Sequence, residues 1–203
     1  MHTWDPHAVS PEAGLERLLQ GNQRFVDGRV TTFTGFRKEL ADGQNPFAVI
    51  VGCSDSRVPA EIVFDLGLGD LFVIRVAGNI IAPSHIGSVE YAVSQFGTRL
   101  VVVMGHTRCG AVGATLSVLD GARSESRNIA SITDRIAPSI REVAAAERDP
   151  QRRYEACVAA NVRASVSQLA HGSRILEDLT LAGRIRIVGT VYAVETGRVS
   201  LLD

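Results

Sequence analysis

The stretch Phe47-Ala48-Val49-Ile50-Val51 is apolar at every position, and two runs of the same kind follow at Leu71-Phe72-Val73-Ile74 and Leu100-Val101-Val102-Val103-Met104. A strand that is apolar throughout, rather than at alternate positions, is typical of a sheet covered on both faces. Helical patterns follow the three runs at residues 59–66, 86–96 and 111–119. Because buried strands alternate with helices, the sequence predicts an α/β fold with a central, mostly parallel β-sheet flanked by helices.

The C-terminal part of the chain continues with helices and ends in a hairpin. Ser124–His171 has a helical, arginine-rich pattern, and its charged run at 147–153 is interpreted as a solvated helix junction because acids and bases are interleaved. Ile185–Val194 indicates a further strand. The turn sequence Glu195-Thr196-Gly197-Arg198 then predicts a hairpin into Val199–Leu202.

The N-terminal region carries an amphipathic helix. Ser10 and Pro11 have the pattern of a helix start, and apolar residues follow at three- and four-residue spacing from Leu15 to Phe25. Such a helix buries its apolar stripe against either the main body of the chain or a partner subunit.

Length and composition bound the functional classes. The chain has 203 residues and a formal net charge of -1, which gives no global attraction to nucleic acid. Its apolar runs are far shorter than the ~20 residues that span a bilayer, and the N-terminus lacks a secretory pattern. We therefore expect a cytoplasmic protein without nucleic-acid or membrane partners. We expect one domain over 1–203, with a helical arm at 1–40 and an α/β core at 45–203.

Two segments with metal-binding side chains follow predicted strands. Cys53 lies just after the first apolar run, and His106 and Cys109 lie just after the third. Sites in open α/β sheets form at the carboxyl ends of strands, so these side chains converge if the two strands are neighbours. Two thiolates and an imidazole suit zinc, and Asp55 could supply a fourth, oxygen ligand. One cysteine alone would be read as a small buried hydrophobe, but the two segments together favour a metal site.

The spacing of these residues favours a catalytic metal over a structural one. The ligands lie about 50 residues apart, unlike the compact knuckle of a structural zinc site. With Asp55 bound to the metal, the site has no open position. With Asp55 released, a water can take the fourth position, and the pKa of that water falls toward ~7. Arg57 is well placed to hold the released carboxylate in a bidentate pair. Asp55 and Arg57 are therefore predicted as catalytic residues that gate the metal.

These segments also resemble a known family. Cys53-Ser54-Asp55-Ser56-Arg57 and Gly105-His106-Thr107-Arg108-Cys109-Gly110, at this separation, are similar to the signature pair of the β-class carbonic anhydrases. Four further segments resemble the family, at residues 21–25, 58–61, 69–75 and 87–92. The similarity runs over nearly the whole chain, from about Gly14 to Val194.

The resemblance implies reversible hydration of CO2 to bicarbonate and a proton, by attack of zinc-bound hydroxide on CO2. By position, Cys53, His106 and Cys109 would hold one Zn2+ per subunit permanently, and the pair of Asp55 and Arg57 would orient and gate the metal. Further positions match residues that bind substrate in a largely apolar pocket: Gln44, Phe72, Ala77, Tyr91 and Gly110. Tyr91 typically comes from the adjoining subunit. The family also implies a homodimer whose N-terminal helices embrace the partner, often paired into a homotetramer.

The sequence leaves two alternatives to this function open. Relatives of the family hydrolyse carbonyl sulfide or carbon disulfide with the same kind of site, and the sequence separates these reactions poorly. A non-catalytic module stabilised by zinc is a further alternative, although such a module has no need of Asp55 and Arg57. His85 and His171 are candidate proton shuttles, and His85 is the better of the two because of its loop position.

Overall fold

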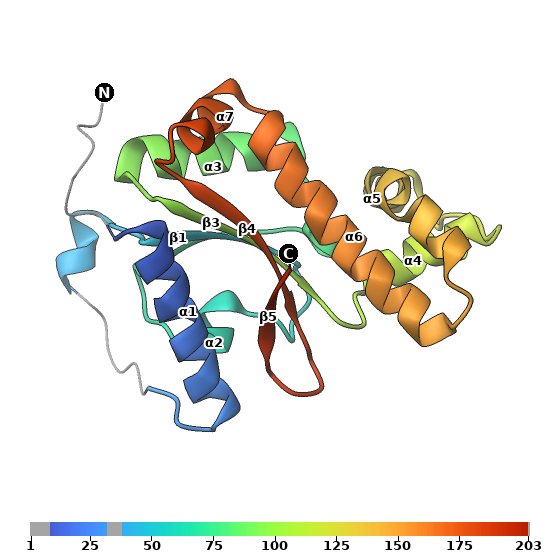
Figure 1. Ribbon diagram of the computed structural model, residues 1–203, viewed down its shortest axis with the longest axis horizontal. Coiled ribbons are helices and arrows are strands. Elements are labelled where there is room, and N and C mark those ends of the chain that lie inside the picture. The colour runs from blue at the N-terminus through green and yellow to red at the C-terminus, as the bar shows by residue number, and fades with distance from the viewer. Residues whose placement is uncertain (1–8, 32–37, 203) are drawn as a thin grey trace.

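The computed structural model describes residues 9–31 and 38–202, and in this part of the chain five strands form one mixed sheet (Figure 1). The strand order is β2-β1-β3-β4-β5. The strands are β1 (Ala48–Gly52), β2 (Leu71–Arg75), β3 (Leu100–His106), β4 (Arg186–Tyr192) and β5 (Val199–Leu202). Strands β2, β1, β3 and β4 pair in parallel, and β5 pairs antiparallel with β4. The predicted mostly parallel sheet and the C-terminal hairpin are therefore confirmed.

Helices cover both faces of this sheet. They are α1 (Pro11–Val26), α2 (Ala60–Val63), α3 (Pro83–Phe96), α4 (Gly110–Leu119), α5 (Arg127–Ala146), α6 (Pro150–His171) and α7 (Arg174–Leu181), with 3-10 turns η1 (Lys38–Ala41) and η2 (Ala77–Asn79). The predicted junction in the arginine-rich segment is confirmed, because α5 ends before it and Asp149 caps α6 within it. Helix α7 was not predicted. None of the described helices is long and apolar enough to cross a membrane.

The two central strands contribute side chains to both faces, as their uninterrupted apolar sequences predict. Ile50 and Val102 pack into the cluster that includes residues of α1, α2 and α4. Val49 and Val101 pack into the opposite cluster, with residues of α3, α6 and α7. All four side chains have 0% exposure, so the sheet is the centre of the core.

Helix α1 packs on the body of its own chain, beside α2 (Figure 1). Leu18 has 1% exposure, and the Asn22 amide donates to the carbonyl oxygens of Val63 and Gly197 at 3.0 and 2.8 Å. The backbone N–H of Val199 donates to the Asn22 side-chain oxygen at 2.8 Å. Of the two surfaces considered for the apolar stripe of this helix, the main body buries these residues, and packing of the arm on a partner subunit stays a prediction.

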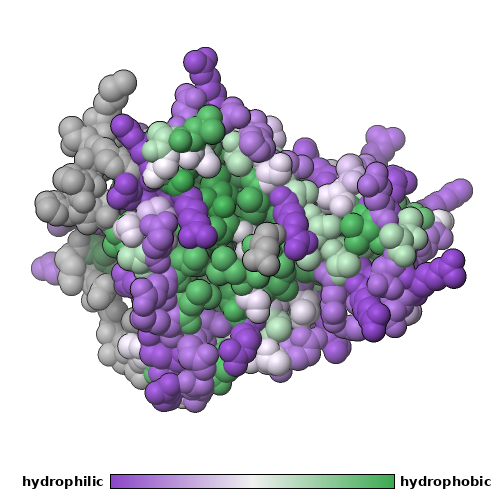
Figure 2. Space-filling view, in the orientation of Figure 1, coloured by the Kyte–Doolittle hydropathy of each residue, from purple (hydrophilic) through white to green (hydrophobic). Residues whose placement is uncertain are grey.

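One face of the molecule carries an apolar surface. Figure 2 shows it between α1 and α6, the region where Figure 1 places β4 and β5 in front. Leu201 on β5 is 37% exposed, and a groove of about 480 Å³ between α1 and Arg186 at the start of β4 is lined by Leu15 and Leu19. Apolar surface of this kind marks regions where protein surfaces associate.

Candidate metal centre

The sheet brings the three predicted metal ligands together. Strands β1 and β3 are parallel neighbours, so Cys53 after β1 and His106 at the end of β3 lie at the same edge. Cys109 follows three residues later as the N-cap of α4. One ligand atom from each residue lies within 4.8 Å of the others, and all three residues are buried. The convergence expected from the strand ends is thus present.

His106 is oriented for metal binding. Its Nδ1 lies 2.8 Å from the carbonyl oxygen of Thr107, which can only accept, so Nδ1 carries the hydrogen and Nε2 offers its lone pair. Nε2 is fully buried and has no hydrogen-bond partner in the structure. An unpaired buried polar atom costs free energy, and a metal ion held with the two sulfurs would remove that cost. The residues present therefore fit zinc.

The two sulfurs share a hydrogen bond, which sets their protonation. This bond from Cys109, followed by bonds that include the Gly78 N–H at 3.3 Å, lowers the pKa of Cys53 to about 4. The pKa of Cys109 is raised, because its thiol donates to the Cys53 sulfur and because it is buried. A metal held by both sulfurs would take them as thiolates, so Cys109 would have to release its proton on binding.

Asp55 pairs with Arg57 beside this cluster. Arg57 Nε donates to Asp55 Oδ1 at 2.9 Å, and Arg57 Nη2 donates to Asp55 Oδ2 at 2.8 Å. These bonds hold the pKa of the Asp55 carboxyl well below its usual range. Asp55 Oδ2 also lies 3.9 Å from His106 Nε2. The structure therefore has the predicted bidentate pair, and binding of Asp55 to the metal stays a prediction.

Further side chains hold the backbone of the metal-binding loops. Arg75 donates to the carbonyl oxygens of Cys53 at 2.9 Å and Asp55 at 2.6 Å. From α6, Asn161 donates to the carbonyl of Gly78 at 2.8 Å. From the sequence, Arg75 is placed behind the site rather than in it, and Asn161 is not identified. The local signal for Asn161 was weak: it is a single asparagine on a helical face that otherwise packs.

The predicted substrate residues fall into two groups. Ala77 precedes Gly78, whose N–H contacts the Cys53 sulfur, and Gly110 begins α4 directly after Cys109. Both therefore lie close to the cluster.

The other three residues lie away from the cluster of their own chain. Gln44 is exposed and precedes β1, at the sheet edge opposite Cys53. Phe72 pairs with Val49 in the first half of β2, and its ring contacts that of Tyr91 at 6.5 Å between centroids. Tyr91 is 54% exposed. The structure of one chain does not bring these residues to the metal ligands.

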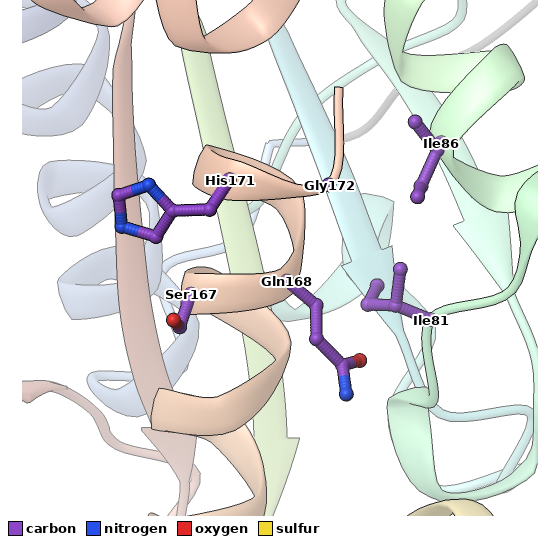
Figure 3. Close-up of a pocket in the computed structure, with 6 residues that line it drawn as sticks. All are labelled: Ile81, Ile86, Ser167, Gln168, His171 and Gly172. Atoms are coloured by element: carbon purple, nitrogen blue, oxygen red, sulfur yellow. The ribbon is translucent and has the colours of Figure 1, made fainter. Parts of the chain in front are cut away.

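A separate cavity of about 390 Å³ lies between α6 and the segment that contains Ile81 and Ile86 (Figure 3). Gln168 points toward the isoleucines in this view, whereas the ring of His171 points to the other side of α6. His171 ends α6, ten residues beyond Asn161, whose amide donates to the carbonyl of Gly78; this is about 15 Å at 1.5 Å per residue. His171 therefore does not contact the cluster of its own chain, and its role as a proton shuttle stays a prediction. His85 stays a candidate.

Comparisons with known proteins agree with this geometry. A family model described as carbonic anhydrase matches residues 48–199. The chain is 40% identical to carbonic anhydrase 2 of Mycobacterium tuberculosis over 198 residues, 96% of this chain and 94% of the relative. It is 42% identical to a carbonic anhydrase of Mycolicibacterium smegmatis over 195 residues, 95% and 93% of the two chains. The solved structure of the β-carbonic anhydrase CcaA superposes with a TM-score of 0.74 and 27% identity, covering 93% of this chain and 87% of that one.

Proposed function

The chain belongs to the β-class carbonic anhydrases, and from this premise we propose that it catalyses zinc-dependent, reversible hydration of CO2 to bicarbonate and a proton at Cys53, His106 and Cys109. One observation carries the proposal. The buried, unpartnered Nε2 of His106 lies with two cysteine sulfurs, beside a carboxylate that Arg57 holds.

Each residue of this centre has a distinct task in the proposed reaction. Cys53, His106 and Cys109 hold the metal, which when bound supplies a Lewis acid that lowers the pKa of a water toward ~7. Asp55 is ionised and acceptor-only, so it can take a hydrogen bond from a water beside the cluster and orient that molecule. Arg57 keeps the carboxylate in this position through its two bonds.

We propose that a second copy of the chain completes the substrate pocket. CO2 is uncharged and is best bound in an apolar slot with few donors. Gln44, Phe72 and Tyr91 have the side chains for this, but they lie at another part of the sheet from the ligands of their own chain. The exposure of Gln44 and Tyr91 supports a homodimer, or a homotetramer built from dimers, in which these residues reach the metal centre of the partner. The apolar surface over β4 and β5 (Figure 2) provides area for such contacts.

Stopped-flow measurement of CO2 hydration tests the function. Zinc-loaded protein is expected to show a rate well above buffer, and Asp55→Asn or Arg57→Ala is expected to lower kcat/KM by about 100-fold. The matched control is the exposed ion pair of Asp27 and Arg29, which has the same two-residue spacing. Asp27→Asn and Arg29→Ala should leave the rate unchanged.

The outcomes separate the alternative functions. A rate no greater than buffer with CO2, together with hydrolysis of carbonyl sulfide, would assign the site to that substrate instead. Zinc bound without turnover of either substrate would indicate a zinc-stabilised module. Loss of activity in the control variants as well as in the Asp55 variant would contradict the proposed roles of Asp55 and Arg57.

A further inference from the structure

The turn between β4 and β5 contacts the loop that carries two of the metal ligands. Glu195 in this turn accepts a hydrogen bond from the Thr107 hydroxyl at 2.7 Å and from Arg108 Nε at 2.5 Å. Thr107 Oγ1 also accepts from the N–H of Val194 at 3.0 Å. Both oxygens of Glu195 are thus used by adjacent residues of the loop between His106 and Cys109.

Arg108 has an unusual backbone conformation. Its φ is 54°, in the left-handed region that is disfavoured for a residue with a Cβ. With this backbone its carbonyl oxygen lies 3.2 Å from Arg57 Nη2 and accepts a hydrogen bond from it. The ion pair with Glu195 holds the Arg108 side chain, and so it favours this conformation over less strained ones.

The same nitrogen of Arg57 holds the catalytic carboxylate. Arg57 Nη2 donates to Asp55 Oδ2 at 2.8 Å and to the Arg108 carbonyl at 3.2 Å. The guanidinium is therefore fixed between the carboxylate and the loop. A continuous set of contacts runs from Glu195 through Arg108 and Arg57 to Asp55, across 140 residues of sequence.

We propose that Glu195 and Arg108 are positioning residues that hold Arg57 in place and so keep Asp55 away from the metal ligands. An exposed ion pair alone contributes little, and the side chains of Arg108 and Glu195 are 69% and 41% exposed. The strained backbone and the second bond, from Thr107, distinguish this pair from an ordinary surface contact. The inference rests on the proposed function, because it concerns the gate of that same site.

A double-mutant cycle tests whether Glu195 acts through Arg57. Glu195→Ala is expected to lower kcat about fivefold with KM changed less than about twofold, and Glu195→Gln is expected to lie between Ala and the wild type. When Arg57 is already lysine, Glu195→Ala should have no further effect on kcat. The control is Glu177→Gln. Glu177 lies on α7 and pairs with His171 of α6, with its side chain 45% exposed, so this change should leave kcat and KM as in the wild type. Additive losses in the double variant, or an unchanged kcat in Glu195→Ala, would overturn the proposal.

A second variant and a structural readout keep the test independent of turnover. Arg108→Asn removes the guanidinium but retains a residue that tolerates the left-handed region, and it should lower kcat as Glu195→Ala does. Crystal structures of zinc-loaded Glu195→Ala and wild type should show Asp55 bonded to Arg57 in the wild type and displaced toward the ligands in the variant. If the wild type lacks CO2 hydration, the proposed function fails, while the position of Asp55 in the two structures still decides this inference. An Asp55 position identical in both structures contradicts it.

Discussion

The hydroxyl oxygen of Tyr154 lies 2.6 Å from the carbonyl oxygen of Cys109, to which it donates a hydrogen bond. Tyr154 belongs to α6, and its ring lies against Gly113 in the first turns of α4. A Cβ added at Gly113 would lie 2.8 Å from the Tyr154 hydroxyl oxygen. The glycine therefore gives the tyrosine access to the backbone of Cys109, a predicted metal ligand.

This contact predicts that Tyr154→Phe lowers the free energy of unfolding by about 1–2 kcal/mol, since a partly buried hydrogen bond is lost. Gly113→Ala should weaken the same contact by displacing the ring. Both variants should lose zinc to a chelator several-fold faster than the wild type. Gly87→Ala on α3 is the matched control, because nothing lies within 4 Å of a Cβ added there. Equal zinc loss in all three variants would count against a role of Tyr154 in holding Cys109.

Metal content distinguishes the three buried cysteines. Cys109→Ser is expected to bind far less than one zinc per chain, because it removes one of three converging ligands. Cys157→Ala is the control, since Cys157 is buried in α6 with its sulfur 3.9 Å from the Ile140 carbonyl and is not in the cluster. It should retain about one zinc per chain, measured by elemental analysis of the purified proteins. Zinc loss in Cys157→Ala and retention in Cys109→Ser would refute the assigned site.

Mixing two inactive variants tests whether the pocket spans two chains. Cys109→Ser lacks a metal ligand and Gln44→Ala lacks the residue that we assign to the site of the partner. After unfolding and refolding together in equal amounts, half of the dimers are mixed and each contains one intact site. About a quarter of the wild-type activity should therefore return.

The control for this experiment is a mixture of Cys109→Ser with Asp55→Asn. Both of these residues belong to the metal centre of one chain, so every site in the mixture is defective and no activity should return. Recovery that does not exceed this control would show that Gln44 acts within its own chain or not at all.

Asn22 is expected to be one of the most sensitive positions outside the metal centre. Its side chain is 3% exposed and makes hydrogen bonds to the backbone of Val63, Gly197 and Val199. Asn22→Ala leaves these groups without their partner and should lower the free energy of unfolding by about 2–4 kcal/mol, measured by urea denaturation. Gln23→Ala, the exposed neighbour, should change it by less than about 0.5 kcal/mol. A similar small effect for both would contradict the structure of this contact.

The stability contribution of Glu195 should depend on pH. Bonds from Thr107 and then Arg108 lower its pKa to about 2 from an ordinary value of 4.5. A lowered pKa means that the folded state favours the carboxylate, so the contribution is complete above about pH 4.5 and is lost as the pH falls toward 2. The difference in unfolding free energy between zinc-free wild type and zinc-free Glu195→Gln should be constant near neutral pH and shrink below about pH 4.5. A difference in unfolding free energy that grows on acidification would mean that folding raises the pKa of Glu195, and would contradict the prediction.

The parts of the fold that were predictable have strong local patterns. Strands β1 and β3 are apolar at nearly every position because both of their faces are buried. The three predicted metal ligands follow from this, since they lie at the ends of these strands or just beyond them. Helix α7 was missed because its eight residues make little more than two turns, too few for an apolar pattern to repeat.

The contacts that support the site were not predictable from local sequence. Tyr154 is 45 residues from Cys109, Asn161 is 83 residues from Gly78, and Glu195 is 87 residues from Arg108. Each of these side chains has its role only because the sheet order brings its element to the metal-binding loops. The position of Gln44 at the opposite edge from Cys53 likewise follows from the direction of β1, which runs between them.

The contacts of Asn22 also bear on when the chain can reach its final structure during synthesis. Its partners Gly197 and Val199 lie 175 and 177 residues later, so they are still unmade when α1 leaves the ribosome. Helix α1 can form early, but this attachment has to wait until the last strand has been translated and has paired with β4. Helix α1 can pack earlier on α2 and β3, which precede β5 in the chain, but its attachment to the C-terminal turn through Asn22 is among the last contacts to form.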